Sequence, residues 1–229
     1  MIDLGQSPTR SRLRIQPHPH RLFGQYEHIL SQLRCLGVAD GQAPRAIGVL
    51  ALESGDGATS IAANLANVAA QSGDESVLLV DANPARPALH GIFGIPSSPG
   101  FIEAMTGAAD PLACTHATRI PGLSVMPCSP VDKGALPSIS PAALAEQVDA
   151  LQQAFDITFV DLPAAGESGL AFTLAKGLTG VVLVLQAERT RRSAALRIKR
   201  QLEYYGVNIL GAVLNKRRHH VPTWLYRSF

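Results

Sequence analysis

The chain has 229 residues, of which 46% are hydrophobic, and this is enough for one domain with a sizeable core and short appendages. The mean hydropathy of +0.13 excludes global disorder. The longest apolar runs, such as Val181–Leu185, are as short as strands and exclude a membrane-spanning helix. Three cysteines without paired spacing exclude a disulfide framework and a zinc site, and no apolar leader follows Met1. We therefore expect a soluble cytoplasmic protein.

The net charge of +2 conceals an uneven distribution along the chain. Residues 1–45 carry six basic and three acidic side chains, residues 46–188 carry four and fourteen, and residues 189–229 carry ten and one. A basic end on an acidic body suits an anionic membrane leaflet, an acidic partner or nucleic acid. A helix with a solvated basic face is the simpler interpretation, and the charge pattern alone leaves both open.

The first part of the chain contains an arm, a helix and a linker. Residues 1–20 have three prolines and no apolar periodicity, which is typical of a flexible arm. Apolar residues recur at helical spacing from Leu22 to Leu33, which predicts one helix over residues 21–36. A linker completes residues 21–43 and leads to the main domain, which we expect over residues 44–216.

The main domain alternates apolar strands with amphipathic helices. Helical stripes are clear in residues 61–71, 144–151 and 190–205. Short apolar strands joined by such helices predict an α/β fold with a parallel, doubly wound sheet covered by helices on both faces. Right-handed crossovers then place every strand-to-helix loop at one sheet edge, where α/β proteins bind ligands. The predicted strands are Ala46–Leu52, Ser76–Asp81, Leu123–Pro127, Ile157–Asp161, Val181–Gln186 and Val207–Leu214.

A glycine-bearing loop, residues 53–60, joins the first strand to the next helix. Backbone N–H groups and the positive end of a helix dipole make such a loop a cradle for phosphate. Gly55 and Gly57 permit close backbone approach, and Thr59 can present its hydroxyl to magnesium. Ala58 stands where a P-loop has lysine, and one lost charge-assisted contact costs about 1.5–3 kcal/mol. A plain glycine turn entering a helix is the alternative interpretation.

The segment after the second strand is more specific. Residues 81–94 read Asp-Ala-Asn-Pro-Ala-Arg-Pro-Ala-Leu-His-Gly-Ile-Phe-Gly. This closely resembles the second Walker motif of the bacterial tyrosine-kinase family of capsule and exopolysaccharide synthesis, Asp-x-Asp-x-x-Arg-Pro-x-Leu-His-x-x-Phe-Gly. Residues 155–163 resemble its Walker B strand, and Gly211–Asn215 resembles its last core strand. The resemblance covers residues 44–216 and implies the P-loop NTPase fold of the partitioning and division-site (ParA/MinD-like) ATPases.

The resemblance also implies a site for ATP and Mg²⁺. Asp81 would act through the metal-bound water or as the base for the attacking hydroxyl, and Arg86 would meet a phosphate. Asp161 would hold magnesium through water, as carboxylates at adjacent strand ends can. A cap at the strand end is the other interpretation of both aspartates. The implied nucleotide contacts are Gly55, Asp56, Gly57, Ala58, Thr59, Ser60 and Asn215, and the implied metal ligands are Thr59, Asp81 and Asp161.

Several departures from the family pattern argue against catalysis. Ala58 replaces the loop lysine, and Asn83 replaces the second acid of the Asp-x-Asp pair with an amide that cannot transfer a proton. The chain has four tyrosines and ends without the tyrosine cluster that autokinase members phosphorylate. Arg86 or Lys216 reaching into the phosphate site would restore a cation there.

We therefore expect a degenerate, kinase-like P-loop protein that acts as a regulatory partner in exopolysaccharide or capsule biosynthesis and export, and not as an active enzyme. We expect it at the cytoplasmic face of the inner membrane, docked on a membrane polysaccharide co-polymerase, as a homo- or hetero-oligomer and without nucleic acid. Two alternatives remain open. One is an active ATPase or tyrosine autokinase with a rearranged phosphate site, and the other is a partitioning-type ATPase on DNA or membrane surfaces.

The C-terminal segment, two tyrosines and four histidines are the remaining candidate features of the sequence. Residues 217–229 form a basic and aromatic tail, which suits a membrane interface, a protein contact or packing over the sheet edge. We expect Tyr204 and Tyr205 to pack against the domain. Paired histidines without a third ligand rarely chelate a metal, so we expect no metal at His18, His20, His219 or His220.

Overall fold

The structure is a computed structural model that describes residues 20–36, 43–73, 75–131, 141–167 and 169–216. The predicted arm up to residue 19, the linker residues 37–42 and the tail from residue 217 lie outside the described residues, and with them His18, His219 and His220, whereas His20 is the first residue of a helix.

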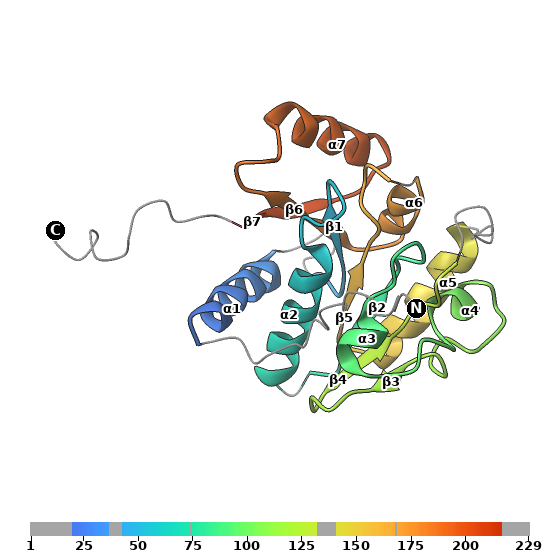
Figure 1. Ribbon diagram of the computed structural model, residues 1–229. Helices are drawn as coiled ribbons and strands as arrows, with labels where there is room; N and C mark the ends of the chain where they lie inside the picture. The colour runs from blue at the N-terminus through green and yellow to red at the C-terminus, as the bar shows by residue number, and fades with distance from the viewer. Residues whose placement is uncertain (1–19, 37–42, 74, 132–140, 168, 217–229) are drawn as a thin grey trace, which may run out of the picture.

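One sheet of seven strands organises the described residues, in the order β3-β4-β2-β5-β1-β6-β7 (Figure 1). Every neighbouring pair is parallel except β3 and β4. The predicted parallel sheet is therefore confirmed, with one antiparallel edge strand of two residues that is too short to show a sequence pattern. The strands are β1 (Ala46–Ala51), β2 (Val77–Asp81), β3 (His116–Ala117), β4 (Leu123–Met126), β5 (Ile157–Asp161), β6 (Gly180–Gln186) and β7 (Ile209–Asn215).

Helices cover both faces of this sheet, as the apolar strands require. The side chains of β1, β2 and β5 alternate between two buried clusters, one on each face. One cluster contains residues of the first three helices, including Leu30, Ile61 and Leu89, and the other contains residues of the last four. In the described part of the chain the helices are α1 (His20–Cys35), α2 (Ala58–Gln71), α3 (Leu89–Phe93), α4 (Phe101–Met105), α5 (Pro141–Ala154), α6 (Leu170–Lys176) and α7 (Arg192–Tyr204).

The strand order creates a crevice at the carboxyl ends of β1 and β5. The connection from β1 through α2 leads past β5 to β2, whereas the connection from β5 through α6 leads past β1 to β6. Neighbouring strands whose connections leave in opposite directions open a binding crevice between them. Asp81 and Asp161 are register partners across β2 and β5, and both strands end there. The topology thus brings both aspartates to the loop after β1.

The two tyrosines after α7 differ in their packing. Tyr205 stacks on Phe172 of α6 with a ring-centroid distance of 5.3 Å. The ring of Tyr204 forms an edge-to-face contact with Tyr205, and Tyr204 is 87% exposed. The expectation that both tyrosines pack against the domain is therefore wrong for Tyr204, because it lies on the face of α7 opposite the buried Ile198 and Leu202.

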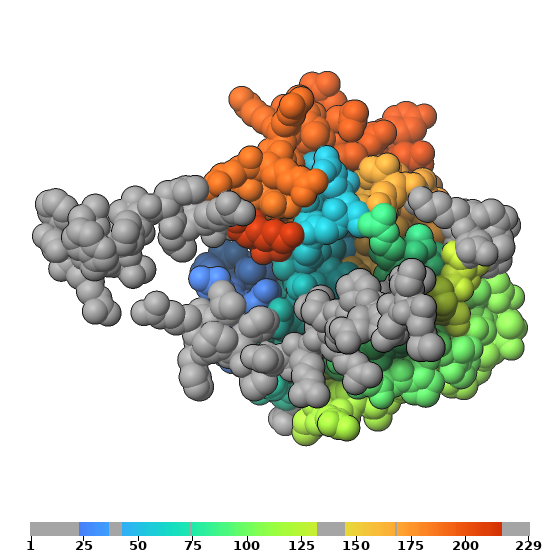
Figure 2. All heavy atoms as spheres, in the orientation of Figure 1, coloured from blue at the N-terminus to red at the C-terminus, as the bar shows by residue number. Residues whose placement is uncertain are grey.

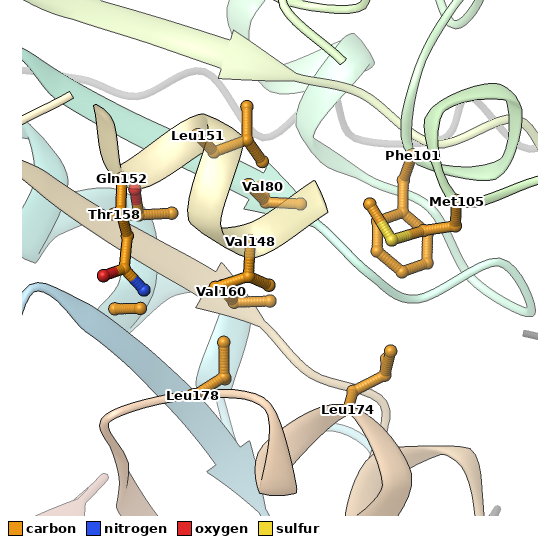
Figure 3. A pocket seen from close by; sticks show the side chains of 11 residues that line it. Val80, Phe101, Met105, Val148, Leu151, Gln152, Thr158, Val160, Leu174 and Leu178 are labelled. Atoms are coloured by element: carbon orange, nitrogen blue, oxygen red, sulfur yellow. The ribbon is translucent and has the colours of Figure 1, made fainter. Parts of the chain in front are cut away.

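A small apolar cavity of about 30 Å³ lies between the sheet and helices α4, α5 and α6 (Figure 3). Phe101, Leu151 and Leu174 line it, together with Thr158 of β5. Thr158 is 4% exposed, and its hydroxyl has no hydrogen-bond partner among the described residues. An unpaired buried hydroxyl weakens a core because it loses water without gaining a partner.

Thr158→Val is therefore expected to raise the free energy of unfolding by about 1 kcal/mol, measured by urea denaturation. Valine has nearly the same shape and removes the unpaired hydroxyl. Thr118→Val is the matched control, because the Thr118 hydroxyl lies 2.9 Å from the Leu123 carbonyl and also accepts the Ile120 N–H. That control should lower stability. A loss of stability in Thr158→Val would show that its hydroxyl is hydrogen-bonded in solution.

Candidate functional site

The loop after β1 leads directly into α2 with two glycines in left-handed conformations. Gly55 has φ 88° and Gly57 has φ 105°, which residues with a side chain rarely adopt. A Cβ on Gly57 would also lie 2.3 Å from Nδ2 of Asn215. Gly57 is the N-cap of α2, and neither a capping side chain nor an acidic first-turn residue neutralises this helix end. The N-terminus of α2 therefore remains electropositive and open to an anion.

Asp161 lies beneath this helix end. Its side chain is 2% exposed, and Oδ2 accepts a hydrogen bond of 2.6 Å from the Thr59 hydroxyl. Oδ1 has no hydrogen-bond partner among the described residues. Burial raises the pKa of Asp161 well above its ordinary value, and the nearby Asp81 carboxylate adds to this effect while the Thr59 bond opposes it. A cation placed here would satisfy the unpaired oxygen.

Asp81 is fully buried and has a different environment. Its Oδ2 accepts the N–H groups of Ala88 and Leu89 at 2.8 and 3.0 Å, and its Oδ1 accepts the N–H of Asn83 at 3.1 Å. Asp81 thus caps the first residues of α3. Burial raises its pKa, although the three N–H groups act in the opposite direction. This is the arrangement of a strand-end cap, the alternative interpretation of its sequence position.

The loop encloses a hollow of about 340 Å³. Of the sequence-predicted site residues, Gly55, Gly57, Ala58, Thr59, Ser60, Arg86 and Asp161 line this hollow, joined by Asn83, Glu167 and Lys216. Asp56, Asp81 and Asn215 are not among the lining residues. Asp56 instead closes the loop through its Oδ2, which accepts the Glu53 N–H at 2.9 Å. Asn215 donates to the Asp56 carbonyl at 2.8 Å.

Two cations reach the rim of the hollow. Arg86 donates to the Ser54 hydroxyl and forms an ion pair of 3.2 Å with Glu167. The ammonium group of Lys216 donates to the Gly55 carbonyl at 2.5 Å. Nothing in the sequence motifs marks Glu167. Lys216 is recognisable only by its position directly after Asn215, at the end of the last strand.

The residues present fit a nucleotide phosphate with Mg²⁺. The open N-terminus of α2 and the two glycines would hold the phosphate oxygens, and the Thr59 hydroxyl with the unpaired Asp161 oxygen would hold the metal. Oxygen ligands of this kind are those that magnesium prefers, and the bound ion would neutralise phosphate charge. The described residues contain no group of three histidine, cysteine or acidic side chains that would hold a metal without the nucleotide.

A parallel sheet with a glycine loop between its first strand and a helix, and with aspartates at two adjacent strand ends, is the arrangement of the P-loop NTPase fold. The family model described as "Cellulose biosynthesis protein BcsQ" matches residues 45–207, and the chain belongs to this family.

Known relatives agree with this assignment. "Tyrosine-protein kinase CpsD" of Streptococcus agalactiae is 27% identical over 215 residues, which are 93% of each chain. The crystal structure of the chimerical protein CapA2B2 is 26% identical, with a TM-score of 0.78 over 90% of this chain and 88% of that chain. The septum site-determining protein MinD of Pyrococcus horikoshii OT3, complexed with Mg-ADP, is 22% identical, with a TM-score of 0.65 over 80% of this chain and 76% of that chain.

The predicted relationship to bacterial tyrosine kinases and the predicted MinD-like fold are both confirmed. Among the described residues, no helix is both long and apolar enough to cross a membrane.

Asp161→Asn is expected to stabilise the nucleotide-free protein, most strongly at high pH. Because the pKa of Asp161 is raised, the folded state holds a proton that the unfolded state releases, and stability falls as the pH rises from the unfolded to the folded pKa. Asparagine keeps an acceptor for Thr59 and removes the charge. The free energy of unfolding should therefore rise by about 1–3 kcal/mol at pH 8 and by less at pH 5, measured by urea denaturation.

Asp156→Asn is the control with the opposite sign. The Ser76 N–H and hydroxyl donate to the exposed Asp156 carboxylate at 2.8 and 2.7 Å and lower its pKa. Its contribution to stability is therefore present at pH 8 and lost as the pH falls through the lowered pKa, so this variant should be less stable than the wild type at pH 8. Destabilisation by Asp161→Asn at both pH values would contradict a buried carboxylate without a counter-charge.

Proposed function

We propose that the protein is a kinase-like regulator of polysaccharide biosynthesis that binds Mg²⁺ and ATP but does not transfer the phosphoryl group. One observation carries the proposal. The binding half of the site is assembled around Thr59 and Asp161, whereas both oxygens of Asp81, expected to act through the metal-bound water or as the base, accept backbone N–H groups, and Asp81 does not line the hollow.

Nucleotide binding is supported by the loop and by α2. Gly55, Gly57 and the first turn of α2 line the hollow beside the loop. Asp161 also lines it, and its buried Oδ1 has no hydrogen-bond partner among the described residues. Each is a feature that phosphate and magnesium use. The absence of a lysine at Ala58 removes one charge-assisted contact, so the affinity expected from the loop alone is lower by about one to two decades.

Loss of phosphoryl transfer is supported by Asp81 and Asn83. A general base must reach the attacking hydroxyl directly or through one water, with a free lone pair. Asp81 accepts three hydrogen bonds, which use three of its roughly four lone-pair sites, and it does not line the hollow from which a substrate hydroxyl would approach. Asn83 does line it, but an amide is neither a general acid nor a general base at neutral pH.

A role in polysaccharide biosynthesis is supported by the family, whose description names cellulose biosynthesis. The tyrosine-kinase relatives support a regulatory role, because the chain keeps their fold over nearly its whole length while it lacks the loop lysine. An active ATPase or autokinase is the second candidate, and the cations Arg86 and Lys216 at the rim favour it. The partitioning-type ATPase is the third candidate, and the basic charge of residues 189–229 favours it.

We place the protein at the cytoplasmic face of the membrane, docked on a polysaccharide co-polymerase through the outer face of α7. This face carries Leu196, Arg197, Arg200 and Tyr204 around an open hollow of about 590 Å³. Leu196 is 42% and Tyr204 87% exposed, and α7 forms one projecting edge of the molecule, in orange in Figure 2. Arginine and tyrosine are enriched at protein interfaces, and the basic charge suits an acidic segment of the partner.

The wild-type protein is expected to bind Mg²⁺ and ATP without turning ATP over. Calorimetry should detect binding that weakens when magnesium is removed, and Thr59→Ala should lose this magnesium dependence because the hydroxyl is an expected ligand. Thr106→Ala, at the end of α4, is the control and should keep it. Phosphate release and phosphotyrosine should stay at background. Release at about 1 s⁻¹ or faster, as in kinases, would establish the second candidate.

Arg197→Glu with Arg200→Glu is expected to weaken binding to membranes that contain the co-polymerase by about tenfold or more, because like charges then face the acidic partner. Sedimentation with membranes from cells with and without the co-polymerase measures this. Arg119→Glu changes an exposed arginine away from α7 and should have no effect. Equal binding of the wild type to protein-free vesicles of anionic phospholipid would contradict docking on a protein.

A further inference from the structure

Two consecutive residues at the end of β7 hold two consecutive carbonyls of the phosphate loop. Lys216 Nζ lies 2.5 Å from the Gly55 oxygen, and Asn215 Nδ2 lies 2.8 Å from the Asp56 oxygen. β7 itself is fixed by parallel pairing with β6, in which Asn215 is the partner of Gln186. The ammonium group is therefore delivered to the loop from a strand 161 residues away, and not from the loop itself.

The backbone of Lys216 is arranged for this delivery. Its φ of 56° lies in the left-handed region, which is uncommon for a residue with a side chain. The Lys216 N–H donates to Oδ1 of Asn215 at 2.8 Å, and this bond stabilises the turn. Backbone conformations of this kind are concentrated at binding and active sites.

Lys216 is also the rim cation that is available to a ligand. Arg86 is paired with Glu167, whereas no carboxylate of the described residues lies within ion-pair distance of Lys216. Its partner is a neutral carbonyl, which is a weaker acceptor for an ammonium group than a phosphate oxygen. Lys216 lines the same hollow as Ala58, Thr59 and Asp161. Asp161 is 2% exposed and its Oδ1 has no hydrogen-bond partner among the described residues, which indicates that this hollow is a ligand site.

We propose that Lys216 supplies the cation that the loop lacks at Ala58, and that its ligand is the phosphate chain of a nucleoside di- or triphosphate. On binding, the ammonium group exchanges the Gly55 carbonyl for a phosphate oxygen. This inference rests on the proposed nucleotide binding and names the residue that makes it effective. Because Lys216 directly follows β7, the phosphate site is completed only when the last strand is in place beside the loop.

Calorimetry with AMP, ADP and ATP, each with Mg²⁺, tests the proposal. Lys216→Ala should weaken ATP and ADP binding by about 10–100-fold, the usual effect of one charge-assisted contact, and AMP binding by much less. Lys216→Arg should keep most of the affinity. Lys176→Ala, an exposed lysine at the end of α6, is the control and should match the wild type. An equal loss for all three nucleotides would show that Lys216 only holds the loop, which would overturn the proposal.

A loop lysine in the Lys216→Ala background provides the second test. Ala58→Lys combined with Lys216→Ala should recover ATP affinity to within a few-fold of the wild type, because one cation replaces another. No recovery would also overturn the proposal. These outcomes distinguish a failure of the Lys216 proposal from a failure of the proposed function. Wild-type ATP binding that Lys216→Ala leaves unchanged overturns only the role of Lys216, whereas no wild-type binding at millimolar ATP overturns the proposed function as well.

Discussion

A buried carboxylate without a counter-charge is the constraint around which this protein is built. Asp161 ends a central strand and is almost completely enclosed, and within the described part of the chain its side chain has one hydrogen bond, from Thr59. An isolated buried charge is costly, and the cost falls only when the group is protonated or meets a cation. The topology enforces the burial, because β5 lies between β1 and β2. Asp161 and the open N-terminus of α2 therefore line the same hollow. The carboxylate is suited to a metal ion and the helix end to phosphate.

Under the proposed function, binding and catalysis separate at this same edge of the sheet. Asp81 is the register partner of Asp161, yet its oxygens are used to begin α3, so the two aspartates have different roles despite their symmetric positions. We propose that this site, in a family related to tyrosine kinases, keeps the means to hold a nucleotide but does not use Asp81 as a base. A nucleotide-dependent regulator needs only the first of these properties, since ligand binding alone can shift a conformational equilibrium.

Much of the fold was predictable because the long elements have clear periods. The predicted strands match β1, β2, β4, β5, β6 and β7 to within two residues at each end. Helices α3, α4 and α6 have five to seven residues, too few to display a helical stripe, and were not predicted. At the site, the motif singled out Thr59 and Asp161, which the structure joins by a hydrogen bond, but it did not distinguish a metal ligand from a cap at Asp81. That distinction depends on where the N–H groups of Ala88 and Leu89 fall. The contact between Lys216 and Gly55 depends on the tertiary fold alone.

The most direct test of this account is a crystal structure of the full chain grown with Mg²⁺ and ADP. The account predicts phosphate oxygens against the first turn of α2, with magnesium held between the phosphates, Thr59 and Asp161. It also predicts that Lys216 Nζ has left the Gly55 carbonyl for a phosphate oxygen. Phosphates bound elsewhere, or bound at the loop with Lys216 still on the carbonyl and Asp81 on the metal, would contradict it.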